Sequence, residues 1–200
     1  LFDLGGVLFY IDYQRTINAF KTLGINNFDT YFSQHQQNSL FDDFEIGKIS
    51  SKNFIRCLKK TLPHCSEREI IYAWNAMLIG LPEEHLFFLE NLSRKYRLFL
   101  LSNANMIHIQ FVNDFLQKKY NLPSINKYFE KAYYSHEIGM RKPHKSTFEW
   151  VLKDANILAK ETLFIDDTAQ HIEGAKKADL KTHQIESNSA IISLFPDTTQ

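Results

Sequence analysis

The first residues that could do chemistry lie in the segment Phe2-Asp3-Leu4-Gly5-Gly6-Val7, where one acidic residue stands inside an apolar run. A carboxylate among apolar side chains is unfavourable unless it binds a cation or takes part in a reaction. The simpler alternative is that Asp3 caps a turn, since aspartate and glycine are both typical turn residues. Asp3 is therefore a candidate nucleophile.

Two further polar sites follow apolar runs later in the chain. Ser102 and Asn103 end the run from Leu98 to Leu101. They offer a hydroxyl and an amide, although both residue types are also common helix N-caps. Lys142 lies in the segment Gly139-Met140-Arg141-Lys142-Pro143, where the following proline restricts the backbone. Phosphate chemistry needs such a fixed cation, and the alternative is a solvated basic loop.

Asp166 and Asp167 are adjacent carboxylates at the end of the apolar run Phe164-Ile165. Two carboxylates this close repel each other unless a cation lies between them, and hard oxygen ligands suit Mg²⁺. One of them could instead cap the following helix, and the two roles are compatible. Because ligands bind at the carboxyl ends of strands in doubly wound sheets, these polar sites are expected to meet.

Alternating strands and helices must position these groups. Apolar β-rich runs predict five buried strands, at Leu1 to Phe9, Leu98 to Leu101, Ala132 to Ser135, Leu163 to Ile165 and Thr182 to Ile185. Helical periodicity separates them, at Glu83 to Tyr96, Asn105 to Tyr120, Lys145 to Ala155 and Ala169 to Ala178. The alternation predicts an α/β fold with a parallel five-stranded sheet and helices on both faces.

Residues 13–81 differ from the rest because they show helical periodicity without convincing strands. The predicted helices are Gln14 to Thr22, Ser51 to Thr61 and Ser66 to Met77. We therefore expect a core of residues 1–12 and 82–200, interrupted by a helical domain of residues 13–81. Leu1 and Phe2 resemble the middle of a buried strand, so we also expect further residues to precede them.

Composition argues against several kinds of partner. The chain has 23 basic and 23 acidic residues without a run of like charge, so no nucleic-acid or membrane-surface partner is predicted. No apolar stretch approaches the roughly 20 residues of a membrane span. Cys57 and Cys65 have neither metal-type nor redox-type spacing, which favours a reducing, cytoplasmic location.

In order and placement, these sites resemble the haloacid dehalogenase superfamily along the whole chain. The resemblance implies a Rossmann-like core, and it makes the helical insert a small cap over the site. Asp3 corresponds to the nucleophile, Ser102 to the second motif and Lys142 to the third. Asp167 corresponds to the direct metal ligand, and Asp166 to a second ligand or one that acts through water. The chemistry is then attack of Asp3 on phosphorus, an aspartyl-phosphate intermediate, and hydrolysis by water.

Three other residues complete this prediction. The backbone carbonyl of Gly5 would bind Mg²⁺, and the Asn103 amide would join Ser102 in binding phosphoryl oxygens. His171 falls where many members have a further acidic residue.

Gly5 is also the main departure, because most phosphatases of the superfamily have a second aspartate there as the general acid. Loss of such an acid typically lowers rates by about 10²- to 10⁴-fold. Asp12, followed by Arg15, is the nearest candidate for a substitute acid or substrate contact, with a helix N-cap as the alternative.

The more specific resemblance is to the bacterial sugar-phosphatase branch, which includes glucose-1-phosphate phosphatases. It rests on the segments around Asp3, Lys142 and Asp166, on Glu173-Gly174-Ala175, and on Phe44-Glu45-Ile46-Gly47-Lys48-Ile49-Ser50. The substrate is then a small phosphorylated metabolite. Side chains that could line its pocket are Phe41, Phe44, Trp74 and Asn75, and the alternative is that they form the core of the helical domain.

Two other functions stay open. The missing acid at Gly5 also fits a degenerate member that binds phosphate with little turnover. The dehalogenase branch lacks the second aspartate too, but its members need no metal and have serine or asparagine in place of the acidic pair. Asp166 and Asp167 therefore favour a Mg²⁺-dependent phosphohydrolase.

Overall fold

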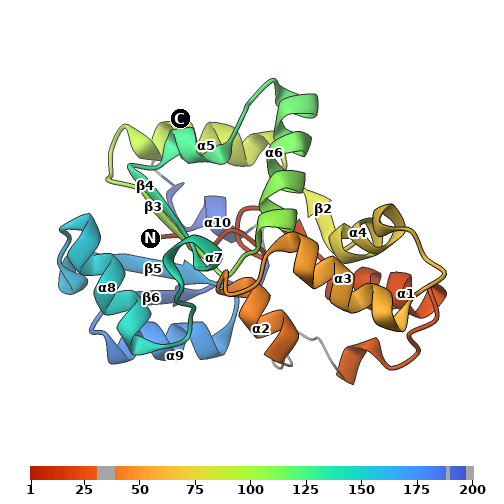
Figure 1. Cartoon of the computed structure of the whole chain (residues 1–200). Coiled ribbons are helices and arrows are strands. Elements are labelled where there is room, and N and C mark those ends of the chain that lie inside the picture. The colour runs from red at the N-terminus through yellow and green to blue at the C-terminus, as the bar shows by residue number, and fades with distance from the viewer. Residues whose placement is uncertain (31–38, 188–189, 197–200) are drawn as a thin grey trace.

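The computed structural model describes residues 1–30, 39–187 and 190–196, and its centre is a set of short parallel strands. The strand β3 (Phe99–Ser102) pairs with β4 (Lys131–Tyr134), and β5 (Leu163–Asp166) pairs with β6 (Lys181–Gln184). Phe2 joins the two pairs, because it forms parallel bridges to Leu100 and Ile165. The N-terminal residues thus lie between β3 and β5, as Figure 1 shows.

Helices cover both faces of these strands (Figure 1). They are α5 (Glu83–Ser93), α6 (Met106–Tyr120), α8 (Lys145–Ala155) and α9 (Ala169–Lys177), with short turns at α7 (Ser135–Ile138), α10 (Ala190–Ser193), η2 (Ile125–Tyr128) and η3 (Ala159–Glu161). Along β3, Phe99 and Leu101 belong to the hydrophobic cluster with α8 and α9, whereas Leu100 belongs to the cluster with α5 and α6. Successive side chains of a strand point to opposite faces, so this alternation accounts for the two cores.

A helical module lies to one side of the strands (Figure 1). It consists of α1 (Tyr13–Thr22), η1 (Phe28–Thr30), α2 (Ser39–Glu45), α3 (Ser51–Thr61) and α4 (Glu67–Asn75). Its buried side chains, among them Phe20, Phe54 and Trp74, form a separate hydrophobic cluster. Capping serines fix two of its helices, since Ser50 accepts from the backbone of Asn53, and Ser66 forms a capping box with Glu69.

The chain enters and leaves the helical module through an antiparallel pair, β1 (Tyr10–Ile11) with β2 (Leu78–Gly80). The sequence did not predict this pair, and it placed one strand from Leu1 to Phe9. That prediction was wrong beyond Asp3, because the chain turns there: the N–H groups of Leu8 and Phe9 both donate to the carbonyl of Leu4. The α/β alternation of the remaining elements is confirmed, and α3 and α8 match their predicted bounds.

Candidate active site

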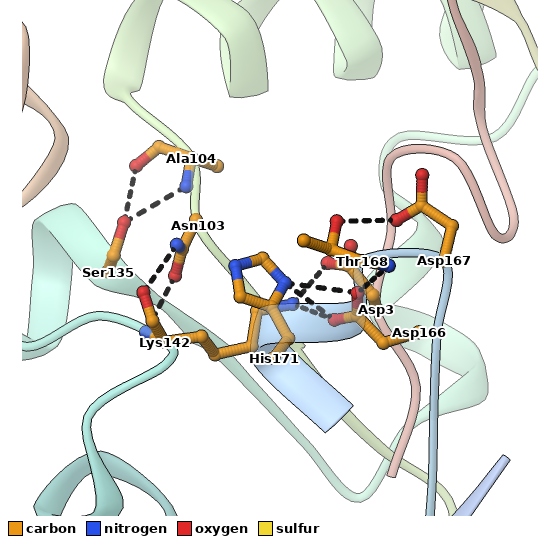
Figure 2. A network of polar contacts seen from close by, with 9 residues as sticks. All are labelled: Asp3, Asn103, Ala104, Ser135, Lys142, Asp166, Asp167, Thr168 and His171. Atoms are coloured by element: carbon orange, nitrogen blue, oxygen red, sulfur yellow. Dashed lines mark hydrogen bonds and ion pairs between the residues drawn. The ribbon is translucent and has the colours of Figure 1, made fainter. Parts of the chain in front are cut away.

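Residues far apart in the sequence meet at the carboxyl ends of the parallel strands (Figure 2). Asp3 follows the bridging residue Phe2, Ser102 is the last residue of β3, and Asp166 is the last residue of β5. The ammonium Nζ of Lys142 lies 2.9 Å from Oδ1 of Asp3 and 2.6 Å from Oδ2 of Asp166. Three of the predicted site residues therefore form one charged cluster.

Lys142 is the cation at the centre of this cluster, and its side chain is fully buried, at 0% exposure. Burial acts to lower the pKa of Lys142, but the charges of Asp166 and Asp3 outweigh burial and raise it. The side chain is therefore charged at neutral pH. A buried cation of this kind is tolerated only with its anionic partners in place.

Asn103 holds the backbone of Lys142 from the end of β3. Its Nδ2 donates to the carbonyl oxygen of Lys142 at 3.0 Å, and the Lys142 N–H donates to its Oδ1 at 2.9 Å. Both ends of the amide contact Lys142, and its binding of phosphoryl oxygens stays a prediction. Asn103 thus positions the backbone of Lys142, and both Asn103 and Ser102 line the cavity.

Asp166 is surrounded by donors. Besides Lys142, the backbone N–H of Thr168 donates to its Oδ1 at 2.8 Å, and Nδ1 of His171 lies 3.0 Å from both carboxylate oxygens. Burial acts to raise the pKa of Asp166, but Lys142 and His171 outweigh it and hold that pKa below its ordinary value. Asp166 therefore stays ionised and serves as the anchor for Lys142.

Asp167 lies on the other side of Thr168 (Figure 2), where its Oδ1 accepts a hydrogen bond from the Thr168 hydroxyl at 3.0 Å. Burial and the nearby charges of Asp3 and Asp166 raise the pKa of Asp167 to about 6. The backbone of Gly6 approaches this carboxylate so closely that a Cβ atom would lie 2.3 Å from its Oδ2. With a φ of +78°, Gly6 is the residue type that both the turn and this contact require.

The carboxylate of Asp3 fits a role in binding a cation. Burial raises its pKa to about 6 in spite of Lys142. Its buried Oδ1 makes an ion pair with Lys142, but no donor among the described residues meets hydrogen-bond geometry there. Oxygens of Asp3 and Asp166 and a ring nitrogen of His171 all lie within 4.8 Å of one another. A divalent cation would relieve the repulsion among these carboxylates, and oxygen donors are those that Mg²⁺ prefers.

A cavity of about 90 Å³ opens beside this cluster. Its wall combines residues from the strand ends with residues from the helical module, including Asp3, Gly5, Ser102, Tyr13, Glu45 and Trp74. A substrate bound at Asp3 would therefore contact both parts of the chain.

The four side chains of the helical module that were predicted to line this cavity divide into two groups. Phe41 and Trp74 lie in its wall. Phe44 and Asn75 are buried but are absent from the residues that line it, and the ring of Phe44 stacks on Phe54 at 4.1 Å between centroids. For Phe44, the alternative of packing in the helical core therefore describes the structure.

Asp12 lies at the start of α1. It is exposed, its Oδ1 accepts from the backbone N–H of Gln14 at 2.9 Å, and it is the N-cap of α1. It is not among the residues that line the cavity, and its roles as substitute acid and substrate contact stay predictions. Its alternative role as an N-cap is confirmed.

Sequence reasoning missed Tyr13 as a site residue. Its ring packs against the hydrophobic cluster of the helical module, and the residue also lines the cavity. Burial, followed by the charges of Glu45 and Asp167, raises the pKa of Tyr13, so the phenol keeps its proton at neutral pH. An aromatic residue at the start of an amphipathic helix gives no sequence signal beyond core packing.

Among the described residues, no helix combines the length and the apolar character that crossing a membrane would require.

The family model of the haloacid dehalogenase-like hydrolases matches residues 83–185 of this chain. The chain is 29% identical to a D-ribitol-5-phosphate phosphatase of Bacteroides thetaiotaomicron over 194 residues, which cover 94% of this chain and 92% of that protein.

Solved structures extend the match. One is a HAD (haloacid dehalogenase) family enzyme from Bacteroides thetaiotaomicron, crystallised as an aspartate-to-alanine mutant with magnesium and inorganic phosphate. It has 34% identity to this chain and a TM-score of 0.89, and the match covers 97% of this chain and 96% of that one. A protein from Porphyromonas gingivalis that is described as a predicted HAD-like family hydrolase has 25% identity and a TM-score of 0.88, with 100% of this chain and 96% of that one covered. The family model spans half of the sequence, and the first of these structures exceeds 30% identity over nearly the whole chain. This protein therefore belongs to the haloacid dehalogenase-like hydrolase family.

Proposed function

We propose that this protein is a Mg²⁺-dependent phosphatase that hydrolyses a small phosphorylated polyol or sugar through an aspartyl-phosphate on Asp3. The observation that carries the proposal is the buried Lys142, whose Nζ contacts Asp166 and also Asp3, a residue of the cavity wall. Such a fixed cation beside a nucleophilic carboxylate is suited to phosphoryl transfer. The relatives that act on or bind phosphate support the same chemistry.

Asp3, Asp167 and the backbone carbonyl of Gly5 would hold the metal. Asp166 is the weaker candidate for a direct ligand, because its Oδ2 already contacts Lys142 and both of its oxygens contact His171. It would then act through water or by orienting Lys142. When bound, Mg²⁺ would offset the negative charge of the phosphoryl group and of the carboxylates.

In the first step an oxygen of Asp3 attacks phosphorus, and the bond from phosphorus to the leaving oxygen breaks. Lys142 and the Ser102 hydroxyl stabilise the phosphoryl oxygens while charge develops on them. In the second step water attacks phosphorus, the bond to Asp3 breaks, and inorganic phosphate leaves, while the proton that water loses returns to the group that protonated the leaving oxygen. Asp3 returns to its starting state.

The leaving oxygen needs a hydrogen-bond donor, and Gly5 supplies no side chain for this purpose. Tyr13 is placed to serve, since it lines the same cavity and its phenol is protonated at neutral pH. It would donate to the leaving oxygen as the phosphorus–oxygen bond breaks. A phenol is a weaker acid than a carboxylic acid, so we expect slower turnover of substrates with poor leaving groups.

The domain division follows from the same proposal. Residues 13–81 act as a helical cap on a core of residues 1–12 and 82–200, in which Leu1 to Asp3 form the central member of a five-stranded sheet. The separate hydrophobic cluster of the helical module and the antiparallel pair at its two ends support this division.

The test is release of phosphate from p-nitrophenyl phosphate and from D-ribitol 5-phosphate by purified protein across a panel of divalent cations. We expect Mg²⁺-dependent activity that falls by about 10³-fold or more in Asp3→Asn. Activity no higher than that of the variant would exclude an enzyme and favour a module that binds phosphate with little turnover. Metal-independent release of halide from a 2-haloacid would instead favour dehalogenation.

A further inference from the structure

Arg141 joins the loop that carries Lys142 to the helical module. Its Nη1 forms an ion pair with Oδ1 of Asp42, and its Nη2 lies 2.8 Å from Oε2 of Glu45. Both acidic residues belong to α2, which lies next to the core at α7 (Figure 1). The residue beside the catalytic lysine thus contacts two carboxylates across the two parts of the chain.

The backbone around Glu45 is fixed against the core. The hydroxyl of Ser135 donates to the Glu45 carbonyl oxygen at 2.6 Å. Two residues later, Gly47 has a φ of +73°, and a Cβ atom there would lie 2.1 Å from the carbonyl oxygen of His136. Glu45 is therefore held in place by its backbone as well as by Arg141.

The two acidic partners of Arg141 differ in where they lie. Glu45 lines the cavity that contains Asp3, and its side chain is 13% exposed. Asp42 is absent from that wall and lines a separate outer pocket, and its side chain is 46% exposed. A role in holding the two parts together could belong to either residue, whereas contact with a ligand in the cavity could belong only to Glu45.

A carboxylate in the cavity wall restricts which part of a bound substrate can lie beside it. It repels the phosphoryl group, whose charge Lys142 and the metal would balance, so it must face the leaving group. Its two oxygens can accept about four hydrogen bonds in all. Hydroxyl groups are the matching donors, while Trp74 and Phe41 of the same wall offer apolar surface to carbon-bound hydrogens.

We propose that Glu45, oriented by Arg141, accepts hydrogen bonds from hydroxyl groups of the leaving group and thereby selects polyol and sugar phosphates over alkyl phosphates. This inference rests on the proposed phosphatase function. It makes Glu45 a specificity-determining residue supplied by the helical module.

The experiment compares kcat/KM for D-ribitol 5-phosphate with kcat/KM for pentyl phosphate, which has a five-carbon leaving group without the further hydroxyls. The variants are Glu45→Gln and, as the matched control, Asp42→Asn, which removes the other carboxylate bound to Arg141. We expect the ratio of the two kcat/KM values to fall by about 10-fold or more in Glu45→Gln, because a hydrogen bond to a charged acceptor is lost. In Asp42→Asn we expect the ratio to stay within about twofold of the wild type.

Three results would overturn the inference: an unchanged ratio in Glu45→Gln, an equal fall of the ratio in both variants, or a wild type without preference for the polyol phosphate. If Glu45→Gln fails to fold, Glu45→Asp replaces it, because it keeps the charge but withdraws it by one methylene, and the same fall in ratio is expected. Pentyl phosphate and p-nitrophenyl phosphate separate the two proposals. Wild-type protein that releases phosphate from none of D-ribitol 5-phosphate, pentyl phosphate and p-nitrophenyl phosphate with Mg²⁺ refutes the phosphatase itself.

Discussion

At the scale of single residues, the cluster around Lys142 is a balance of buried charges, and removal of the cation should destabilise the protein. We expect Lys142→Met to lower the free energy of unfolding by about 3–5 kcal/mol, because Asp3 and Asp166 would be left buried without their partner. Urea unfolding at neutral pH measures this.

The matched control is Lys145→Met, three residues later. Its ammonium pairs with Glu149 at 3.0 Å, but both side chains are more than half exposed. Such surface pairs contribute at most about 1 kcal/mol. Equal stability losses in the two variants would contradict the central role of Lys142.

Tyr13 gives a second prediction at this scale. If its phenol donates to the leaving oxygen, Tyr13→Phe should lower kcat for an alkyl phosphate by about 10²-fold, and kcat for p-nitrophenyl phosphate much less, since nitrophenolate needs little protonation. Steady-state kinetics on both substrates tests this. A purely structural role would lower both rates by the same factor.

At the scale of elements, α9 packs closely on the loop that carries Lys142. A Cβ atom on Gly174 would lie 2.1 Å from the carbonyl oxygen of Pro143. Replacement of glycine by alanine inside an exposed helix normally stabilises by about 1 kcal/mol. Here the close contact should reverse the sign of that effect. We expect Gly174→Ala to destabilise the protein by about 1–3 kcal/mol, and to lower kcat because the loop that carries Lys142 is displaced. A variant more stable than the wild type in urea unfolding would show that the loop can shift freely.

The elements also show how far the sequence alone could predict the structure. Local signals sufficed for α3 and α8, where a capping serine or a left-handed Asn156 marks a helix end. They failed beyond Asp3, where apolar residues continue through a turn and imitate one long strand. Contacts such as that of Asn103 with Lys142, 39 residues apart, depend on how elements pack, and no local pattern encodes that.

The same limit explains the result for the candidate site. Asp3, Lys142 and Asp166 could be predicted because each follows an apolar run, and parallel strands bring such positions to one edge. Tyr13 could not, because nothing in its neighbourhood distinguishes a cavity wall from a hydrophobic core. Asp12 had a suitable residue type and position, but its carboxylate is used by the helix that it begins.

At the scale of the whole molecule, the acidic site should couple stability to pH and to metal. The pKa of Asp3 and that of Asp167 are raised from 3.8 to about 6 on folding. Folding therefore favours their protonated forms, so this stability is fully present below about pH 4 and is lost as pH rises towards about 6.

Magnesium should reverse that loss. We expect millimolar Mg²⁺ to raise the Tm by several degrees at about pH 7.5 and much less at about pH 5, where protons compete for the same carboxylates. Thermal unfolding with and without Mg²⁺ measures the difference. Asp3→Asn should reduce the shift at the higher pH. A shift of equal size at both pH values would argue that the cation binds elsewhere.

The antiparallel pair of β1 with β2 has one more consequence, for how such chains diversify. Because Tyr10 pairs with Gly80 and Ile11 with Leu78, the two ends of the helical module leave the core side by side. A segment with neighbouring ends can be exchanged for another of different length without moving the flanking strands. The same core could thus carry a different helical module between Ile11 and Leu78. It would then acquire a new substrate while its chemistry stays the same.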